Sequence, residues 1–192
     1  MEKKILKGVI EIRWHGRGGQ GTWTASELLV RAAVLEGKYI QSFPEFGPER
    51  MGAPVLAFTR VSMKPIKPHC AVYNPDVVVV LDSTLMRTVP VTEGLDENGK
   101  LIINSRDSPM DVKQKLGVNK FEVWTVPATD IAIKILGAPI TSTAMLGAVA
   151  RATGVVGLES IGKIIRERFR RSDIAEKNFA VVKEAYMEAR FA

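Results

Sequence analysis

Cysteine and histidine are scarce in this sequence of 192 residues: it has one cysteine, Cys70, and two histidines, His15 and His69. A single cysteine excludes an intramolecular disulfide, a multi-cysteine zinc site and an iron–sulfur cluster held by this chain alone, because each needs further thiolates. We therefore expect no metal on this chain. With no activating environment visible around it, we interpret Cys70 as a small buried residue.

Long hydrophobic runs are also lacking. The longest uninterrupted apolar run covers residues 77–81, far short of the about 20 residues that a membrane-spanning helix needs. The charged first seven residues lead into a strand pattern rather than into the apolar core of a secretion signal. We expect a soluble, cytoplasmic protein without membrane contact.

The remaining composition is that of a globular protein, with 46% hydrophobic and 25% charged residues, and the length suits a single domain over residues 1–192. The net charge of +6 is spread along the chain, with its densest basic run at residues 166–171 inside a helical pattern. We favour a solvated helix face, or a surface for an acidic partner or anionic cofactor, over a nucleic-acid site.

Apolar runs alternate with helical patterns along the chain. We predict strands at residues 9–14, 39–43, 54–61, 77–81, 101–103 and 121–126, and helices at 22–36, 129–136, 142–152 and 173–190, with another helix starting at 107–109. The run 77–81 is apolar on both faces, as in a central strand covered from two sides. This alternation predicts an α/β fold with a mostly parallel sheet and helices on both faces.

Two helix starts have local signals. Pro109 suits the first position of a helix, and Asp173 with Glu176 forms an acidic variant of the capping box.

A glycine-rich turn joins the first predicted strand to the first helix. It contains the pattern G-x-G-x-x-G in residues Gly16, Arg17, Gly18, Gly19, Gln20 and Gly21. Glycines permit positive φ and close approach of the backbone, and free N–H groups at the helix start favour an anion such as phosphate. Three interpretations stay open: a tight turn alone, a site for a phosphate-bearing ligand to which Arg17 adds charge, and a subunit contact.

A dinucleotide site would also need an acidic residue near the end of the second strand, to bind the ribose. That place holds Gln41, Ser42 and Phe43, and the nearest acid, Glu45, follows a proline. Binding of NAD is therefore disfavoured.

The segment 43–54 holds three prolines and two glycines, so it cannot form a regular element. Long irregular loops are uncommon in compact domains unless they have a function. We interpret this loop as an interaction surface, with a purely structural crossover as the alternative. Its candidate partner-binding residues are Glu45, Phe46, Gly47, Pro48, Glu49, Arg50, Met51 and Gly52.

Other polar residues allow two interpretations each. The hydroxyls of residues 141–143 either cap the following helix or line an anion site. Asp82 ends the central strand, where ligand crevices of α/β folds lie, or caps the next segment. His15 lacks a companion for catalysis, so we interpret it as structural, and no catalytic residue is assigned.

Several stretches together resemble one family: G-R-G-G-Q-G at 16–21, F-G-P-E-R-M-G-A-P at 46–54, N-P-D-V-V-V-V-L-D at 74–82 and A-M-L-G-A at 144–148. The chain is similar to the gamma subunits of 2-oxoacid:ferredoxin oxidoreductases, most closely those acting on pyruvate. The resemblance implies a Rossmann-like α/β fold. Ser142 stands where this family often has asparagine, and it joins residues 16–21 as a candidate cofactor-binding residue.

The resemblance implies an enzyme that converts pyruvate and coenzyme A to acetyl-CoA and CO2 and passes two electrons to ferredoxin. It implies a heterotetramer with alpha, beta and delta subunits, in which thiamine diphosphate, Mg²⁺ and [4Fe–4S] clusters are held by chains other than this one. A subunit for 2-oxoisovalerate or another 2-oxoacid is the alternative, and a stand-alone nucleotide-binding oxidoreductase is less favoured. We expect this chain to shape the site and the assembly, with residues 16–21 near an anionic group such as the phosphates of coenzyme A.

Overall fold

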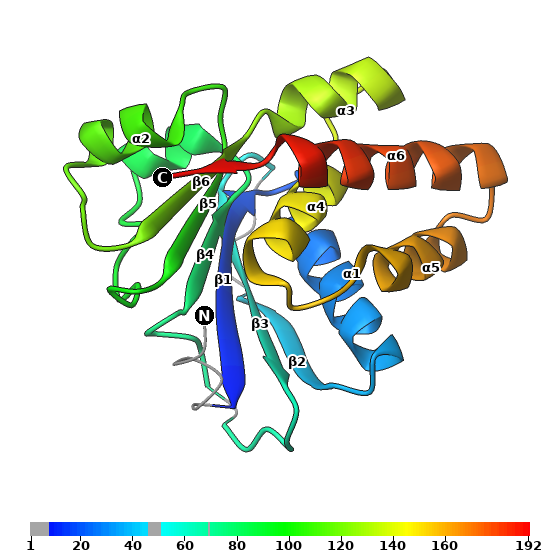
Figure 1. Ribbon diagram of the computed structural model, residues 1–192, viewed down its shortest axis with the longest axis horizontal. Helices are drawn as coiled ribbons and strands as arrows, with labels where there is room; N and C mark the ends of the chain where they lie inside the picture. Colours follow the sequence, from blue (N-terminus) through cyan, green and yellow to red (C-terminus); the bar gives the residue numbers. More distant parts are fainter. Residues whose placement is uncertain (1–7, 46–50, 69) are drawn as a thin grey trace.

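A computed structural model describes residues 8–45, 51–68 and 70–192. These residues form a seven-stranded sheet with the strand order β2-β3-β1-β4-β5-β6-β7 (Figure 1). The strands are β1 (Val9–Arg17), β2 (Tyr39–Glu45), β3 (Pro54–Ser62), β4 (Val77–Val80), β5 (Lys100–Asn104), β6 (Glu122–Val126) and β7 (Arg190–Phe191).

Most of the strands run in the same direction. β1, β4, β5 and β6 are parallel neighbours. β3 is antiparallel to both β1 and β2, so β2 runs the same way as β1, while β7 opposes β6. The mostly parallel, Rossmann-like sheet is confirmed, with the departure that β2 and β3 form an antiparallel hairpin.

Helices cover both faces of this sheet, also as predicted (Figure 1). One face carries α1 (Thr22–Leu35), α3 (Ala128–Leu136), α4 (Ser142–Thr153), α5 (Leu158–Arg168) and α6 (Ser172–Glu188), and the other carries the 3-10 helix η2 (Ser83–Arg87) and α2 (Pro109–Leu116). α1 ends before Gly37, whose φ of 74° suits a residue just past a helix. α2 has Pro109 at its first position and a capping box between Ser108 and Asp111.

Strand β4 separates two hydrophobic cores. Val77 and Val79 pack into the core beneath α1 and α4, whereas Val78 and Val80 pack into the core beneath α2. Side chains of a strand alternate between faces, so the continuous valine run fills both cores. The prediction of a central, doubly covered strand is confirmed.

Two local predictions are wrong. α6 begins at Ser172, so Asp173 lies inside the first turn instead of capping it, and its carboxylate pairs with Arg171 at 3.0 Å. Cys70 is exposed rather than buried. Its backbone carbonyl accepts a hydrogen bond from Nη1 of the buried Arg60 at 2.8 Å, and its Sγ accepts one from Nη2 of the same guanidinium at 3.9 Å.

The C-terminal segment departs from prediction as well. α6 ends at Glu188, and Arg190 and Phe191 form strand β7 instead of continuing the helix. The ring of Phe191 stacks on Trp124 with 4.7 Å between the centroids. Within the described ranges, no helix has the length and apolar character required to cross a membrane.

Candidate functional site

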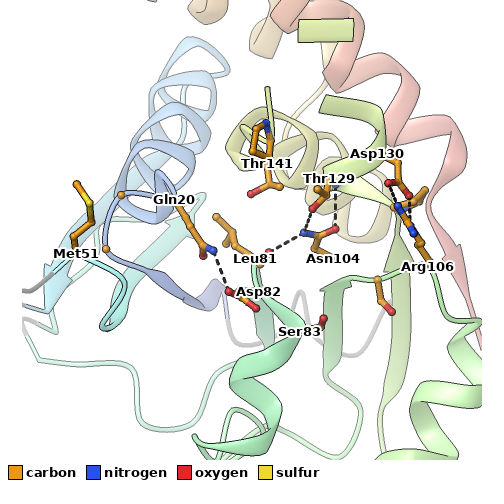
Figure 2. A pocket seen from close by; sticks show the side chains of 15 residues that line it. Gln20, Met51, Leu81, Asp82, Ser83, Asn104, Arg106, Thr129, Asp130 and Thr141 are labelled. Carbon is orange, nitrogen blue, oxygen red and sulfur yellow. Dashed lines mark hydrogen bonds and ion pairs between the residues drawn. The ribbon is translucent and has the colours of Figure 1, made fainter. Parts of the chain in front are cut away.

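A pocket of about 800 Å³ opens at the carboxyl ends of the parallel strands. Its wall is built from the turn after β1, the start of η2, the loop after β5 and the segments that lead into α3 and α4 (Figure 2). The chain turns toward β3 and β2 after β1, but toward β5 and β6 after β4. The pocket therefore lies at a point where strand order reverses, the usual ligand position in open α/β sheets.

Residues 16–21 form the turn predicted from sequence, and their glycines serve two different purposes. Gly19 and Gly21 have φ of 92° and 76°, conformations that residues with a Cβ rarely adopt. Gly16 lies within β1, where a Cβ would come within 2.0 Å of the Thr22 hydroxyl oxygen. Gly18, Gly19 and Gln20 line the pocket.

Arg17 and Asp82 form an ion pair at this end of the sheet, in which Nε of Arg17 donates to Oδ2 of Asp82 at 2.9 Å. Nε2 of Gln20 donates to the same oxygen at 3.0 Å (Figure 2). The other carboxylate oxygen accepts the backbone N–H of Thr84 at 2.9 Å. Both interpretations of Asp82 hold, since it lines the pocket and caps η2.

Asp82 is ionised at neutral pH. Burial raises the pKa of its carboxyl, but hydrogen bonds from Thr84, Gln20 and Arg17 outweigh burial and hold the pKa below the usual value. The positive charge of Arg17 is consequently balanced inside the protein.

Three helices begin at the pocket: α1 follows the glycine-rich turn, and α3 and α4 follow lining segments. The first N–H groups of a helix have no partner within it and carry partial positive charge, so helix starts attract anions. Thr141, the residue before α4, lines the pocket, whereas Ser142 is 5% exposed and its Cβ lies 3.1 Å from the Cβ position of Gly21. A ligand contact by Ser142 stays a prediction.

The hydroxyl-capping interpretation of residues 141–143 is wrong. Thr141 occupies the cap position of α4 with helical backbone angles and makes no side-chain capping bond. The Thr143 hydroxyl instead bonds Oδ1 of Asn178 on α6 at 3.2 Å. The N–H groups at the start of α4 are therefore left without a hydroxyl cap.

The far side of the pocket was not predicted. Nδ2 of Asn104 donates to the carbonyl of Leu81 and to the hydroxyl of Thr129, each at 2.9 Å, bracing β4, β5 and α3 (Figure 2). Nε of Arg106 pairs with Oδ2 of Asp130 at 2.6 Å. Asn104 directly follows the apolar run 101–103, and a polar residue after a buried parallel strand is the signal that could have identified this wall.

The candidate partner-binding loop meets the glycine-rich turn. Phe46, Gly47, Pro48, Glu49 and Arg50 lie outside the described residues, while Glu45 ends β2 and is exposed. Met51 lines the pocket and is 95% exposed. The N–H of Gly18 donates to the carbonyl of Ala53 at 2.9 Å, and the N–H of Gly52 donates to the carbonyl of Gly18 at 3.1 Å. Two backbone hydrogen bonds therefore join the glycine-rich turn to residues 52–53, although the two segments are far apart in the sequence.

His15 is structural in this geometry. It is buried, and its Nε2 accepts a hydrogen bond from Nε of Arg13 at 3.1 Å. Burial, reinforced by the Arg13 charge, lowers the pKa of His15 to about 3, so the ring is neutral. The described pocket lining contains no histidine, cysteine or lysine, and both of its aspartates are paired. This wall is suited to binding and orienting an anion rather than to proton transfer.

Residues 11–188 match the model of the pyruvate ferredoxin/flavodoxin oxidoreductase family. A common gamma subunit of the pyruvate and ketoisovalerate oxidoreductases of Pyrococcus furiosus is 52% identical over 93% of this chain and 96% of its own length. The pyruvate synthase subunit PorC of Methanocaldococcus jannaschii is 46% identical over 94% and 97%. The crystal structure of the pyruvate oxidoreductase subunit PORC of Thermotoga maritima superposes with a TM-score of 0.87 at 42% identity, covering 96% of this chain and 99% of that one.

Proposed function

This chain belongs to the pyruvate ferredoxin/flavodoxin oxidoreductase family, and we propose that it is the gamma subunit of a multisubunit 2-oxoacid:ferredoxin oxidoreductase. The favoured reaction is the conversion of pyruvate and coenzyme A to acetyl-CoA and CO2, with two electrons passed to ferredoxin. Alpha, beta and delta subunits are the proposed partners, in the cytoplasm. The similarity to PorC subunits over nearly the whole chain supports this assignment.

Within such a complex, the residues of this chain do not fit an iron–sulfur cluster. Clusters are held by several cysteine thiolates, and the chain has only Cys70. Among the described residues, no three His, Cys, Asp or Glu side chains gather as a metal site requires. We therefore assign the iron–sulfur clusters of the complex to other subunits, and to this subunit placement and electrostatics.

The proposed task of this chain is to hold an anionic group of coenzyme A at the pocket. One observation carries the proposal: three helix starts and the glycine-rich turn meet at one pocket, which is large enough for part of a nucleotide. Gly18 and Gly19 let the ligand approach the backbone closely, and the charge of the anion is matched by partial charges of the N–H groups rather than by a free cation.

The test begins with an affinity-tagged chain purified anaerobically from its native host. Three companion subunits, iron and thiamine diphosphate should accompany it, and assays with pyruvate and with 2-oxoisovalerate then identify the substrate. Recovery of the chain alone would instead favour a nucleotide site in its own right.

A matched pair of glycine variants then tests the pocket in the purified complex. In Gly19→Ala the new methyl group strains the backbone at φ 92° and lies 4.0 Å from the Met51 side chain, so the KM for coenzyme A should rise. Gly154→Ala is the control, because Gly154 has a similar positive φ of 63° with open space around it at the opposite end of α4. An equal KM in both variants, with complete assembly, would contradict the proposal.

The loop supplies a second proposed role, contact with a partner subunit. Met51 is 95% exposed, so Met51→Asp should leave the thermal midpoint of the chain unchanged. If a partner covers this side chain, the buried charge should reduce the recovery of companion subunits. Normal assembly of the Met51→Asp chain would exclude this contact.

The gamma subunit of Pyrococcus furiosus is named as common to pyruvate and ketoisovalerate oxidoreductases. This supports a shared role as the alternative for the present chain. A shared subunit would co-purify with two sets of companions that differ in their preferred 2-oxoacid.

A further inference from the structure

We propose that Arg17 and Asp82 are positioning residues, and that their ion pair joins the glycine-rich turn, the end of β4 and residues 51–53 into one rigid rim of the pocket. Arg17 therefore does not itself bind the ligand. This inference rests on the proposed binding of an anionic group of coenzyme A at the pocket. It replaces the expectation that Arg17 adds a free positive charge to the site.

Each of the three guanidinium nitrogens of Arg17 donates to an acceptor within the protein, and Arg17 is absent from the described pocket lining. Nε donates to Asp82 at 2.9 Å, Nη1 donates to the carbonyl of Gly52 at 3.1 Å, and Nη2 donates to the hydroxyl of Thr84 at 2.9 Å. The planar fork of an arginine can reach three such acceptors at once, which a lysine ammonium at the end of a flexible chain cannot match. Two of the acceptors, Asp82 and Thr84, belong to the segment that follows β4, and the third, Gly52, lies just before β3.

Asp82 is equally occupied. Its Oδ2 accepts from Arg17 and Gln20, and its Oδ1 accepts from the N–H and the hydroxyl of Thr84, the latter at 2.6 Å. A carboxylate offers about four acceptor positions, so none remains for a ligand hydroxyl. Asp82 instead fixes the side chains of Arg17 and Gln20, and the Oε1 of Gln20 in turn accepts the N–H of Arg17 at 2.8 Å.

These bonds act together with the backbone contacts between Gly18 and residues 52–53. The turn that would bind the anion cannot shift without breaking the ion pair or the contacts to Gly52. Loss of either Arg17 or Asp82 should loosen the same rim and weaken the binding of coenzyme A. Loss of both should weaken binding little more than loss of one, because the remaining partner no longer holds the rim once the ion pair is broken.

The experiment is a double-mutant cycle in the assembled complex, with Arg17→Gln, Asp82→Asn and the two combined. Each single variant should raise the KM for coenzyme A about tenfold while kcat changes less than about twofold. The double variant should also show about a tenfold rise rather than a hundredfold one. Arg31→Gln is the control, because it breaks an exposed ion pair with Glu167 outside the pocket.

A direct anion contact by Arg17 makes the opposite prediction for Asp82→Asn. That change would free a cation, and the KM for coenzyme A would stay equal or fall. Arg17→Lys separates the models again: a positioning role predicts the same loss as Arg17→Gln, whereas a charge contact predicts that affinity is kept. Either of these results would overturn the inference.

A second readout does not depend on the ligand or on activity. Amide hydrogen exchange of the full chain should become faster at Gly18 and Gly52 in both single variants, and unchanged exchange there would also overturn the inference. If Gly19→Ala raises the KM for coenzyme A but the pair variants do not, the positioning role fails while the pocket assignment stands. If none of these variants alters the KM, both proposals fail.

Discussion

Gly147 lies where α4 and α6 cross, and its substitution should destabilise the protein. A Cβ on Gly147 would come within 2.2 Å of the Val182 carbonyl oxygen and 3.2 Å of the Tyr186 backbone nitrogen. Non-bonded heavy atoms need roughly 3.5 Å, so Gly147→Ala forces the helices about 1 Å apart or strains their backbones. Overpacking of this kind costs about 1–3 kcal/mol or more. The obstacle is backbone, which cannot rotate away, so the upper part of that range applies.

Alanine has a higher helix propensity than glycine, which offsets about 1 kcal/mol of this cost. The net loss of unfolding free energy for Gly147→Ala is therefore about 2 kcal/mol. For a chain of this size, that loss lowers the thermal midpoint by about 4–8 °C, which circular dichroism of the purified chain measures. Gly162→Ala is the matched control inside α5, because its Cβ would meet the ring edge of Phe179 at 2.9 Å, a side chain that can turn. A thermal midpoint of Gly147→Ala equal to that of Gly162→Ala would refute the reasoning.

Two further predictions concern buried polar groups. The folded pKa of His15 is about 3, below its unfolded value of 6.5, so only the unfolded chain gains this proton between those pH values. The free energy of unfolding should therefore fall by about 1.4 kcal/mol for each unit of decreasing pH in that window. In urea unfolding experiments, His15→Gln should reduce this dependence of stability on pH. An unchanged dependence would contradict the assignment of His15. The indole N–H of the buried Trp14 donates to the Thr59 hydroxyl at 3.0 Å. Thr59→Val should cost about 1–3 kcal/mol of unfolding free energy by leaving that N–H unpaired, whereas Thr59→Ser should cost less, and equal losses would count against the bond.

The glycine-rich turn and the central strand could be predicted because their signals are local. Positive φ at Gly19 and burial of both faces of β4 each follow from a short run of residues. The pairing of Gly18 with Ala53 could not be predicted, since it depends on β3 reversing direction beside β1. The prediction of a mostly parallel sheet did not specify which strand runs against the others.

Long-range contacts also explain the other errors. Asn104 meets Thr129 across 25 positions of sequence, and only the sheet order places them together. Threonine is a common capping residue, but the backbone angles of Thr141 are helical and its side chain makes no capping bond to the following N–H groups. The residue type could be read from the sequence, whereas the backbone conformation depends on the preceding segment.

The β2–β3 hairpin has a consequence for how such chains can diversify. β2 runs parallel to β1, so the connection between β2 and β3 starts and ends at the sheet edge that holds the pocket. Each doubling of loop length raises the entropic cost of loop closure by only about 0.6 kcal/mol. Insertions or deletions between Glu45 and Met51 would thus reshape the pocket entrance while the strand pairing and the contacts of Gly52 and Ala53 stay the same. Evolution can alter what enters this pocket through positions outside those pairings.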